Sequence, residues 1–277
     1  IAEASILNKI SFVGKVGIPM RIVIKVGTST LAHSTGLMNV RRVELLCSVL
    51  SDLKNAGHEV VLVSSGAIGM GVGKLSLGGR PSDIPTKQAA AAVGQCELMY
   101  TYDRLFSTYN HTVAQILVTA EDIAHEERKQ NFKNTLFRLL ELHALPIINE
   151  NDTVATREIV IGDNDTLGAV VATAIHADLL VILSDIDGRY TADPHTHADA
   201  QLLPTVEEIT AEIEAMTGGA GSALGTGGMA TKLHAAHIAT EGGVEMVIAN
   251  GRDPAILYDI VEGKPVGTHF KAKEAAR

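Results

Sequence analysis

Two clusters of polar residues lie close together in the chain, each beside a segment that must be buried. The first cluster, 149–152 (NEND), follows the apolar run 145–148. The second, 162–165 (GDND), directly precedes a stretch rich in Ala and Val. Asn, Asp and Gly are common in turns and helix caps because their side chains bond nearby backbone groups. Two such clusters, one at each end of the segment 149–165, favour a polar binding site over a pair of plain turns.

Two lysines could supply positive charge to such a site. Lys25 interrupts the apolar run 21–26 (RIVIKV), and Lys232 closes a glycine-rich loop, 225–232 (GTGGMATK). Glycine backbone N–H groups, a hydroxyl and a lysine that lead into a helix N-terminus favour a bound anion. With carboxylates between them, the lysines suit phosphoryl transfer, in which cations offset the charge of the transferred group and acidic residues hold the cations in place.

Three better-known catalytic or phosphate-binding motifs do not fit the chain. A Walker A loop needs Ser or Thr after its lysine, but Leu233 follows Lys232. The dinucleotide fingerprint GxGxxG fails because Ser76 stands three residues after Gly73. Ser65 lies in SSGAIG and not in GxSxG, so an acyl-transfer triad is not indicated.

The composition limits the classes to which the protein can belong. A chain of 277 residues can bury a large core, and 46 % apolar but only 4 % aromatic residues suit a sheet covered by Ala-rich helices. The net charge of −9 argues against a nucleic acid as partner. No apolar run approaches a membrane span, so no membrane partner is predicted. Cys47 and Cys96 are predicted to be reduced, buried residues of a cytoplasmic protein.

The first twenty residues stand apart from the rest of the chain. Residues 1–20 have neither the apolar block nor the small-residue cleavage site of a signal peptide. We interpret them as an N-terminal extension, natural or left over from expression, and either ordered or disordered. No internal repeat and no Pro/Ser-rich linker divides the residues after this extension, so 21–270 is predicted to be one domain.

The elements that would position the polar groups alternate between strand and helix. Strands are predicted where β-branched residues run together, and helices where apolar residues recur every three or four positions. This alternation indicates right-handed crossover units and a mainly parallel sheet that binds ligands at the carboxyl ends of its strands. Strands are predicted at 21–26, 59–63, 112–118, 145–148, 178–183, 245–249 and 266–270, and helices at 39–56, 86–109, 126–143, 165–176, 205–216, 230–241 and 254–261.

Local signals define some of these boundaries. Asp165 is predicted to cap the helix 165–176, and the capping box 205–208 (TVEE) is predicted to begin the helix that ends near Met216. The alternating segment 156–161 is predicted to form half of a hairpin. The glycine-rich segment 66–73 has no assigned structure.

Seven segments, in order along the chain, resemble the glutamate 5-kinase branch of the amino acid kinase family. The resemblance extends over roughly 21–270, which makes it more specific than any single motif. The segments are IKVGTSTL (24–31), VSSGAIGMG (63–71), KQAAAAVGQ (87–95), INENDTVAT (148–156), GDND (162–165), YTADP (190–194) and GTGGMATK (225–232).

The resemblance implies a three-layer αβα sandwich around a mainly parallel sheet, with a glutamate-binding N-terminal half and an ATP-binding C-terminal half. The implied reaction is ATP-dependent phosphorylation of the γ-carboxylate of L-glutamate to L-glutamyl 5-phosphate, the first step of proline biosynthesis. Mg²⁺ would arrive on the ATP phosphates, with no metal ligand assigned in the protein. The resemblance also implies a cytoplasmic homo-oligomer, a dimer or a tetramer, and L-proline as feedback inhibitor.

The resemblance further assigns roles to residues. These fall into a catalytic, a glutamate-binding and an ATP-binding group. The catalytic group is Lys25, Lys232 and Asp165, the glutamate-binding group is Ser65, Asp152 and Asn164, and the ATP-binding group is Lys25, Ser184, Asp185, Thr226, Gly227, Gly228, Met229, Ala230, Thr231 and Lys232. In this scheme the two lysines stabilise the transferring group and Asp165 holds both of them.

Two features depart from the family pattern. Arg189 stands where an apolar residue is usual, close to the expected nucleotide pocket. The sequence ends at Arg277 without the C-terminal PUA module that many members carry, either because the protein is naturally short or because it is truncated. Two other hypotheses remain. One is a sister kinase of the same fold that acts on acetylglutamate, aspartate, carbamate or a nucleoside monophosphate. The other is a regulatory protein that binds a nucleotide or an amino acid without catalysis, which the presence of both lysines and Asp165 disfavours.

Overall fold

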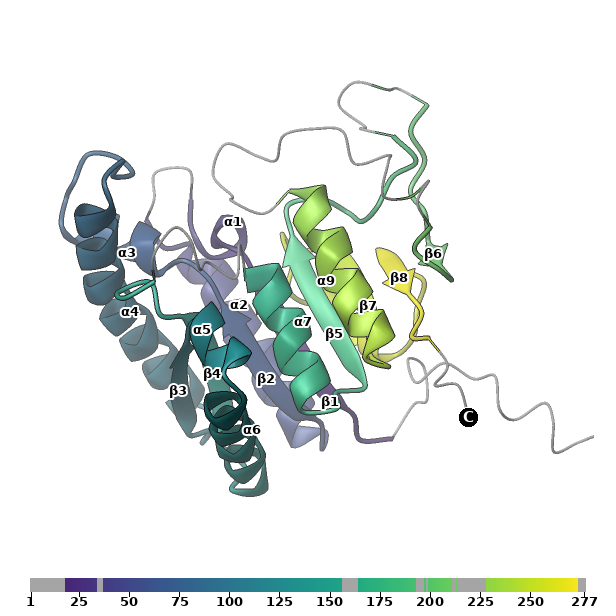
Figure 1. Ribbon diagram of the computed structural model, residues 1–277, viewed down its shortest axis with the longest axis horizontal. Coiled ribbons are helices and arrows are strands. Elements are labelled where there is room, and N and C mark those ends of the chain that lie inside the picture. The colour runs from purple at the N-terminus through teal and green to yellow at the C-terminus, as the bar shows by residue number, and fades with distance from the viewer. Residues whose placement is uncertain are drawn as a thin grey trace, which may run out of the picture.

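The computed structural model of the protein describes residues 18–33, 37–155, 164–192, 197, 199–210, 213 and 228–273. Within these residues, one sheet runs through the centre of the molecule (Figure 1). Its strands are β1 (Arg21–Val26), β2 (Glu59–Ser64), β3 (Val113–Val118), β4 (Leu145–Glu150), β5 (Leu179–Ser184), β6 (Thr205–Val206), β7 (Glu245–Asn250) and β8 (Thr268–Phe270).

The sheet is mainly parallel, as predicted. Its eight strands follow the order β3-β4-β2-β1-β5-β7-β8-β6. Every neighbouring pair is parallel except β7 and β8. Because β1 pairs with β2 on one side and β5 on the other, the first strand of the chain lies in the middle of the sheet. The carboxyl ends of β1, β2, β4, β5 and β7 consequently reach the same edge.

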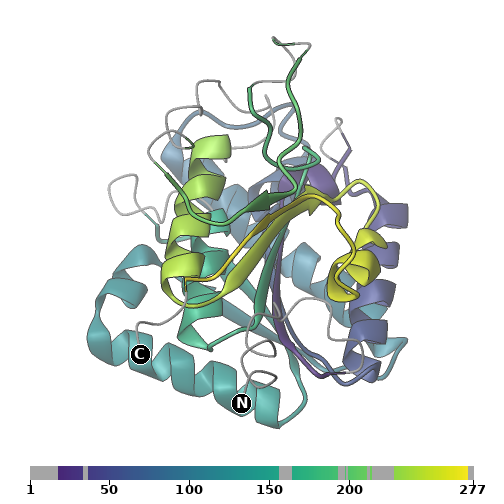
Figure 2. The ribbon, with the colours of Figure 1, turned by 90° about the vertical axis from the view of Figure 1, so that its right-hand side faces the viewer.

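Helices cover both faces of the sheet, which gives the predicted αβα sandwich. One face packs against α2, α4 and α10, and the other against α6, α7 and α9 (Figures 1 and 2). The helices are α1 (Thr28–Leu31), α2 (Val40–Asn55), α3 (Ala67–Lys74), α4 (Ile84–Ser107), α5 (Ala120–Ala124), α6 (Glu126–Glu141), α7 (Asn164–Ala174), α9 (Met229–Glu241) and α10 (Ile256–Val261). None of the helices in the described part of the chain is both long and apolar enough to cross a membrane.

The alternation of side chains along β1 divides the buried residues into two cores. Ile22 and Ile24 belong to the core beneath α2 and α10, whereas Val23 belongs to the core beneath α7 and α9. Successive side chains of a strand point to opposite faces, so Lys25 shares the face of Val23. The strand itself therefore directs the Lys25 side chain towards α7.

Helix α2 shows how closely local signals define an element. The side chain of Asn39 accepts a hydrogen bond from the backbone N–H of Arg42, and the helix ends before Gly57, whose φ is 98°. The apolar stripe recognised in the sequence lies against the sheet and is fully buried. It consists of Val43, Leu46, Leu50 and Leu53.

The glycine-rich segment that follows β2 forms the helix α3, which packs very closely against α4. A methyl group at Gly71 would overlap the carbonyl oxygen of Ala90, and one at Gly94 would overlap that of Ala67. The two glycines thus allow the two backbones to approach each other where any larger residue would force them apart. The contact holds α4 in place beside the residues at the end of β2.

The structure contradicts the predictions for Thr205–Val206 and for Cys96. Thr205 and Val206 do not begin a helix but form the short strand β6, which pairs in parallel with His269 and Phe270 of β8. Burial of Val206 against the sheet outweighs the local capping-box pattern. That pattern contains no information about pairing with β8, which lies more than sixty residues away in the chain. Cys47 is buried as predicted, but Cys96 is exposed.

Several predicted features lie outside the described residues. These are most of the N-terminal extension, the half-hairpin at 156–161 and most of 211–227, which includes the end of the helix predicted over 205–216.

The contact between α3 and α4 gives a first testable prediction. Gly71→Ala should lower the free energy of unfolding by about 1–3 kcal/mol or more, because the added methyl group must push the backbone of α4 aside. Gly79→Ala is the matched control, since nothing lies within 4 Å of a Cβ at that glycine. Urea unfolding of both variants measures the effect. Equal stability of the two would contradict the close contact.

Candidate active site

Three charged side chains meet where the carboxyl edge of the sheet faces the starts of two helices. Lys25 comes from the end of β1, Asp165 from the first turn of α7 and Lys232 from the first turn of α9. In Figure 1, α7 and α9 begin at the edge to which the arrow of β5 points. The right-handed crossover of each strand into the next helix places these residues together although more than 200 positions separate the two lysines.

Asp165 forms ion pairs with both lysines through different oxygens. Lys25 Nζ lies 2.6 Å from Oδ1 and Lys232 Nζ lies 3.1 Å from Oδ2. Asp165 is fully buried, and Lys25 and Lys232 are only 7 % and 5 % exposed. The Thr231 hydroxyl also donates to Oδ2, at 3.4 Å. Two ammonium groups share one carboxylate, so the trio offers positive charge to a further anion.

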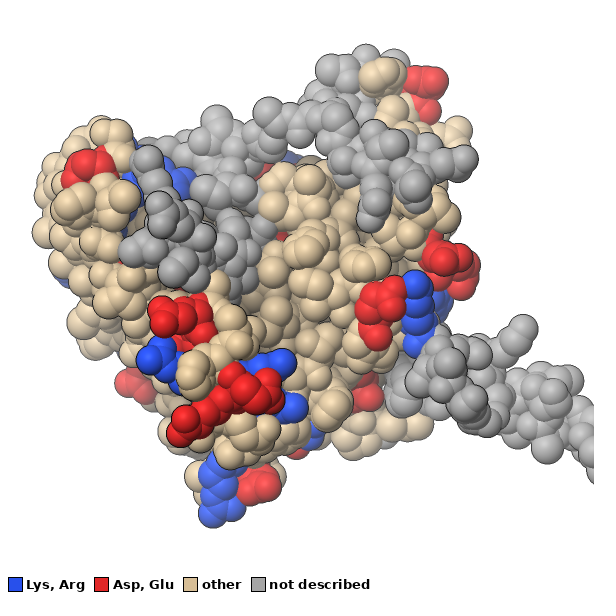
Figure 3. Space-filling model, viewed as in Figure 1, with Lys and Arg blue, Asp and Glu red and all other residues tan. Residues whose placement is uncertain are grey.

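The electrostatics of this trio depend on the two lysines. Burial alone would raise the pKa of Asp165, but the adjacent ammonium groups of Lys25 and Lys232 outweigh it and hold the pKa below its usual range. On the face shown in Figure 3, charged side chains gather over α6 while the surface over α7 and α9 shows few. The charges at the starts of α7 and α9 are turned inward to the sheet.

The structure corrects the predicted capping role of Asp165. Helix α7 begins at Asn164, so Asp165 lies inside the first turn. Its carboxylate is turned towards the lysines instead of towards backbone N–H groups at the helix start. An acidic residue in the first turn remains favourable for the helix dipole, and this explains why the sequence pattern resembles a cap.

A second group of side chains lies beside the trio and carries amide and hydroxyl groups. Asn164 Nδ2 donates to Ser65 Oγ at 2.7 Å and to Asn149 Oδ1 at 2.9 Å. Asn149 Nδ2 in turn donates to Gln95 Oε1 at 3.0 Å. The structure thus brings the predicted pair Ser65 and Asn164 together and adds two residues. The sequence feature that could have indicated a role for Gln95 is its position as a polar residue on the buried side of an Ala-rich helix.

Asp152 lies in the turn that follows β4, as predicted. It is half-buried, and this burial raises the pKa of its carboxyl group, while the nearby Arg80 acts in the opposite direction. A carboxylate that is partly removed from water binds a cationic ligand more readily than an exposed one. No contact joins Asp152 directly to Ser65 or Asn164 among the interactions described.

The predicted nucleotide-binding residues lie on the other side of the trio. The Ser184 hydroxyl at the end of β5 donates to Asp185, which is exposed. Gly228 precedes the first residue of α9, and the segment Met229–Lys232 forms its first turn. Because glycine has no side chain to cap them, the N–H groups at the start of α9 are available to an anion. Thr226 and Gly227 lie outside the described residues.

Arg189, which departs from the family pattern, is a buried connector. It is 4 % exposed, and its guanidinium donates to the carbonyl of Ile213 at 3.2 Å. Its backbone N–H donates to the hydroxyl of Thr268 at 2.7 Å. Arg189 therefore links the segment that follows β5 to Thr268 of β8 and to Ile213.

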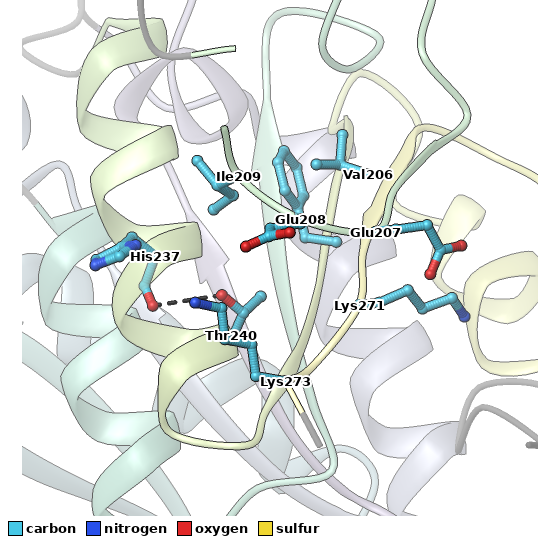
Figure 4. Close-up of a pocket in the computed structure, with 9 residues that line it drawn as sticks. Val206, Glu207, Glu208, Ile209, His237, Thr240, Lys271 and Lys273 are labelled. Atoms are coloured by element: carbon cyan, nitrogen blue, oxygen red, sulfur yellow. Dashed lines mark hydrogen bonds between the residues drawn. The ribbon is translucent and has the colours of Figure 1, made fainter. Parts of the chain in front are cut away.

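A small hollow on the surface lies apart from the charged trio. It is formed between β6, the second half of α9 and the end of β8, and Figure 4 shows Thr240 and His237 of α9 on one side of it with Lys271 on the other. It contains none of the predicted site residues. We assign it no role in the chemistry.

Similarity to known proteins identifies the family of the chain. A model of the amino acid kinase family matches residues 20–250. The chain belongs to the amino acid kinase family. A glutamate 5-kinase of Clostridium perfringens is 54 % identical over 92 % of this chain and 96 % of its own length. A glutamate 5-kinase of Listeria innocua is 50 % identical over 92 % of this chain and 94 % of its own length.

Two solved structures share the fold of this chain. An isopentenyl phosphate kinase matches with a TM-score of 0.65 at 16 % identity, over 91 % of this chain and 100 % of that one. The carbamate kinase of Giardia lamblia bound to AMP-PNP also matches with a TM-score of 0.65 at 16 % identity, over 93 % of this chain and 100 % of that one. At this identity the likeness concerns the arrangement of the sheet and helices, which confirms the predicted fold class.

The buried trio predicts how stability depends on Asp165. Asp165→Asn should lower the free energy of unfolding at neutral pH by about 3 kcal/mol, because it leaves two buried ammonium groups without their carboxylate. The pKa of Asp165 is lowered in the folded state, so its contribution is complete above the usual pKa of 3.8 and is lost as the pH falls towards the lowered value. The difference between wild type and variant should therefore shrink below that pH.

Urea unfolding at neutral pH and at about pH 3 measures this difference. Asp259→Asn is the control, because Asp259 forms an exposed ion pair with Lys264 and should change stability little. A difference between Asp165→Asn and wild type that stays constant over the whole pH range would contradict the assigned pairing.

Proposed function

We propose that this protein catalyses the ATP-dependent phosphorylation of the γ-carboxylate of L-glutamate. The observation that carries the proposal is the Lys25–Asp165–Lys232 trio at the carboxyl edge of the sheet, in a chain whose curated relatives at 50–54 % identity are named glutamate 5-kinase. The product is L-glutamyl 5-phosphate, from which proline biosynthesis proceeds. We also propose that the reaction takes place in the cytoplasm.

The chemistry needs positioning and charge more than proton transfer. A γ-carboxylate oxygen attacks the γ-phosphorus of ATP, a new O–P bond forms, and the bond to the β-phosphate oxygen breaks to release ADP. The carboxylate is already a nucleophile, so no general base is required. Lys25 and Lys232 offset the negative charge that spreads over the transferring group and the leaving oxygen, while Asp165 fixes both ammonium groups in place.

Glutamate is assigned to the side of the trio formed by Ser65, Asp152 and Asn164. The α-ammonium group of an amino acid requires an acidic or carbonyl partner, and the half-buried carboxylate of Asp152 suits it. Asn164, which directly precedes Asp165 in the chain, contacts Ser65, and the two complete this polar group of side chains. We assign the N-terminal half of 21–270 to this substrate.

ATP is assigned to the C-terminal half, where a helix start and a glycine leave room for phosphates. The first turn of α9 directs the N–H groups of Met229 and Ala230, together with Lys232, to this edge. A Cβ at Gly27 would lie only 3.6 Å from Lys25 Nζ, so the glycine keeps the space beside that ammonium group open. Ser184, Asp185, Gly228 and Thr231, with Thr226 and Gly227, complete the proposed nucleotide site.

Magnesium is included in the proposal as a partner of ATP. Among the residues that the structure describes, no three His, Cys, Asp or Glu side chains are grouped to hold a metal ion. Mg²⁺ commonly binds through substrate phosphates and water, and when bound it would neutralise phosphate charge. No step of the reaction is assigned to a protein-held metal.

Regulation and assembly complete the proposal. Proline carries an α-carboxylate and a cationic α-nitrogen like those of glutamate, and we infer that it inhibits by occupying the same groups. We also propose that the protein forms a homo-oligomer, a dimer or a tetramer.

The reaction is tested by trapping its product. Incubation with ATP, Mg²⁺ and hydroxylamine should yield a hydroxamate with L-glutamate, because hydroxylamine attacks an acyl phosphate. N-acetylglutamate and aspartate should yield little. A better yield with either of these acids would indicate a sister kinase, and no product with any acid would indicate a binding protein without catalysis.

The charge contact of Lys232 gives the next prediction. Lys232→Ala should lower kcat by about 10²-fold or more, since it removes one cation from the transition state. Lys264→Ala is the control, because Lys264 is exposed and pairs with Asp259 and Glu262 at the surface. The hydroxamate assay measures both variants, and an unchanged kcat in Lys232→Ala would overturn the assignment.

Asp152 should affect one substrate only. Asp152→Asn removes the charge that pairs with the α-ammonium group, so KM for glutamate should rise about tenfold or more, as for loss of a charged hydrogen bond. KM for ATP should stay close to the wild-type value. A change confined to KM for ATP would show that Asp152 belongs to the nucleotide site.

A further inference from the structure

A continuous line of hydrogen bonds connects helix α4 to the proposed glutamate pocket. It runs from Gln95 on α4 to Asn149 at the end of β4, then to Asn164 at the start of α7 and to Ser65 after β2. Gln95 is 7 % exposed and Asn149 is 2 % exposed. The line therefore lies mostly out of contact with water, where each polar atom depends on its protein partner.

The direction of these bonds is determined by one backbone group. The backbone N–H of Glu150 donates to the side-chain oxygen of Asn149 at 2.9 Å. A backbone N–H can only donate, so the atom that faces it must be the oxygen Oδ1. The amide nitrogen of Asn149 then faces Gln95, and the Gln95 atom that meets it must be the acceptor Oε1.

The same direction continues into the pocket. Since Asn149 presents its oxygen, Asn164 must present its NH₂ group to it, and the second N–H of that group donates to Ser65 Oγ. Ser65 Oγ accepts this bond, which directs the hydroxyl hydrogen elsewhere. Asn164 Oδ1 is buried and has no hydrogen-bond partner among the described residues. Among the described groups this leaves one acceptor, Asn164 Oδ1, and one donor, the Ser65 hydroxyl, for a ligand.

This pair of groups matches the backbone end of an amino acid. An α-ammonium group needs acceptors such as Asn164 Oδ1, and an α-carboxylate needs donors such as the Ser65 hydroxyl. If the Asn164 amide were turned over, its NH₂ group would face the ammonium group and repel it. The orientation of the two asparagine amides therefore decides which polarity the pocket presents.

We propose that Gln95 is a positioning residue that anchors the Asn149 amide, whose orientation the Glu150 N–H sets, and thereby contributes to selectivity for glutamate. The inference rests on the proposed function, because it concerns the same pocket. Gln95 provides the only acceptor that the described residues show for Asn149 Nδ2, and this bond holds the amide in its place. The neighbouring Gly94 brings α4 against α3, the helix that follows Ser65, so the distance from Gln95 to the pocket is fixed by backbone contact.

Two substitutions at Gln95 test the proposal. Gln95→Met has a similar volume but removes the acceptor, so KM for L-glutamate should rise about tenfold, the scale of one buried hydrogen bond of about 1.4 kcal/mol. KM for ATP should change less than about twofold, because the trio and α9 are untouched. Gln95→Glu keeps an acceptor for Asn149 and should retain KM for glutamate within about threefold of wild type.

Glutarate, which is glutamate without the α-ammonium group, separates orientation from packing. Its inhibition constant should be nearly the same in Gln95→Met as in wild type, because glutarate has no ammonium group to donate to Asn164 Oδ1. The ratio of the glutarate inhibition constant to KM for glutamate should thus fall about tenfold in Gln95→Met alone. Gln130→Met, an exposed position on α6, is the control for the substitution itself.

The thermal unfolding midpoint of each variant shows that it is folded before kinetics are compared. An unchanged glutamate KM in folded Gln95→Met would overturn the proposal. Equal losses of glutamate and glutarate binding in both Gln95 variants would also overturn it, since they would show a packing role only. Absence of hydroxamate in the wild-type enzyme would instead refute the proposed function.

Discussion

The burial of the Asp165 charge is the constraint on which the arrangement of the site depends. A carboxylate removed from water is unstable unless cations and hydrogen bonds replace the lost solvation. Asp165 has no exposed surface, and it obtains these partners from two lysines that belong to different parts of the fold. Each lysine in turn is nearly buried and depends on the same carboxylate. The end of β1 and the starts of α7 and α9 are therefore joined electrostatically at this one carboxylate.

The parallel sheet makes this junction possible. Side-chain alternation along β1 sends Ile22 and Ile24 to one core and Val23 to the other, and Lys25 follows Val23 to the face beneath α7. In a strand buried on both faces a lysine is tolerated only at the end, where its ammonium group can reach a partner. The glycine at position 27 then stops the strand and leaves space beside that group. Chemistry is confined to the edge of a sheet that is otherwise apolar.

Most of the fold could be predicted from the sequence because its elements are locally consistent. The sequence predicts α2 from its apolar stripe, and the stripe is present in the structure together with the Asn39 cap. It predicts β1, β2 and β5 from their β-branched runs, and these strands also form. The strand β6 was missed because Thr205 and Val206 obtain their structure from β8, which the local pattern cannot represent. The trio and the Ser65–Asn164 contact agree with the roles implied by family resemblance. The Gln95–Asn149 contact was not predicted, because hydrogen bonding between distant residues leaves no periodic trace in a sequence.

The position of β1 in the middle of the sheet has a consequence for the chain during its synthesis. Strands β1 to β4 form one side of the sheet and are made first, so that half can begin to fold while the rest is still absent. At that stage Lys25 lies at an uncovered edge, and Asp165 and Lys232 emerge from the ribosome only later, the second of them in α9. A nascent or truncated chain thus exposes one side of β1 and has no competent centre. The Lys25–Asp165–Lys232 trio can form only after the first turn of α9 has been made.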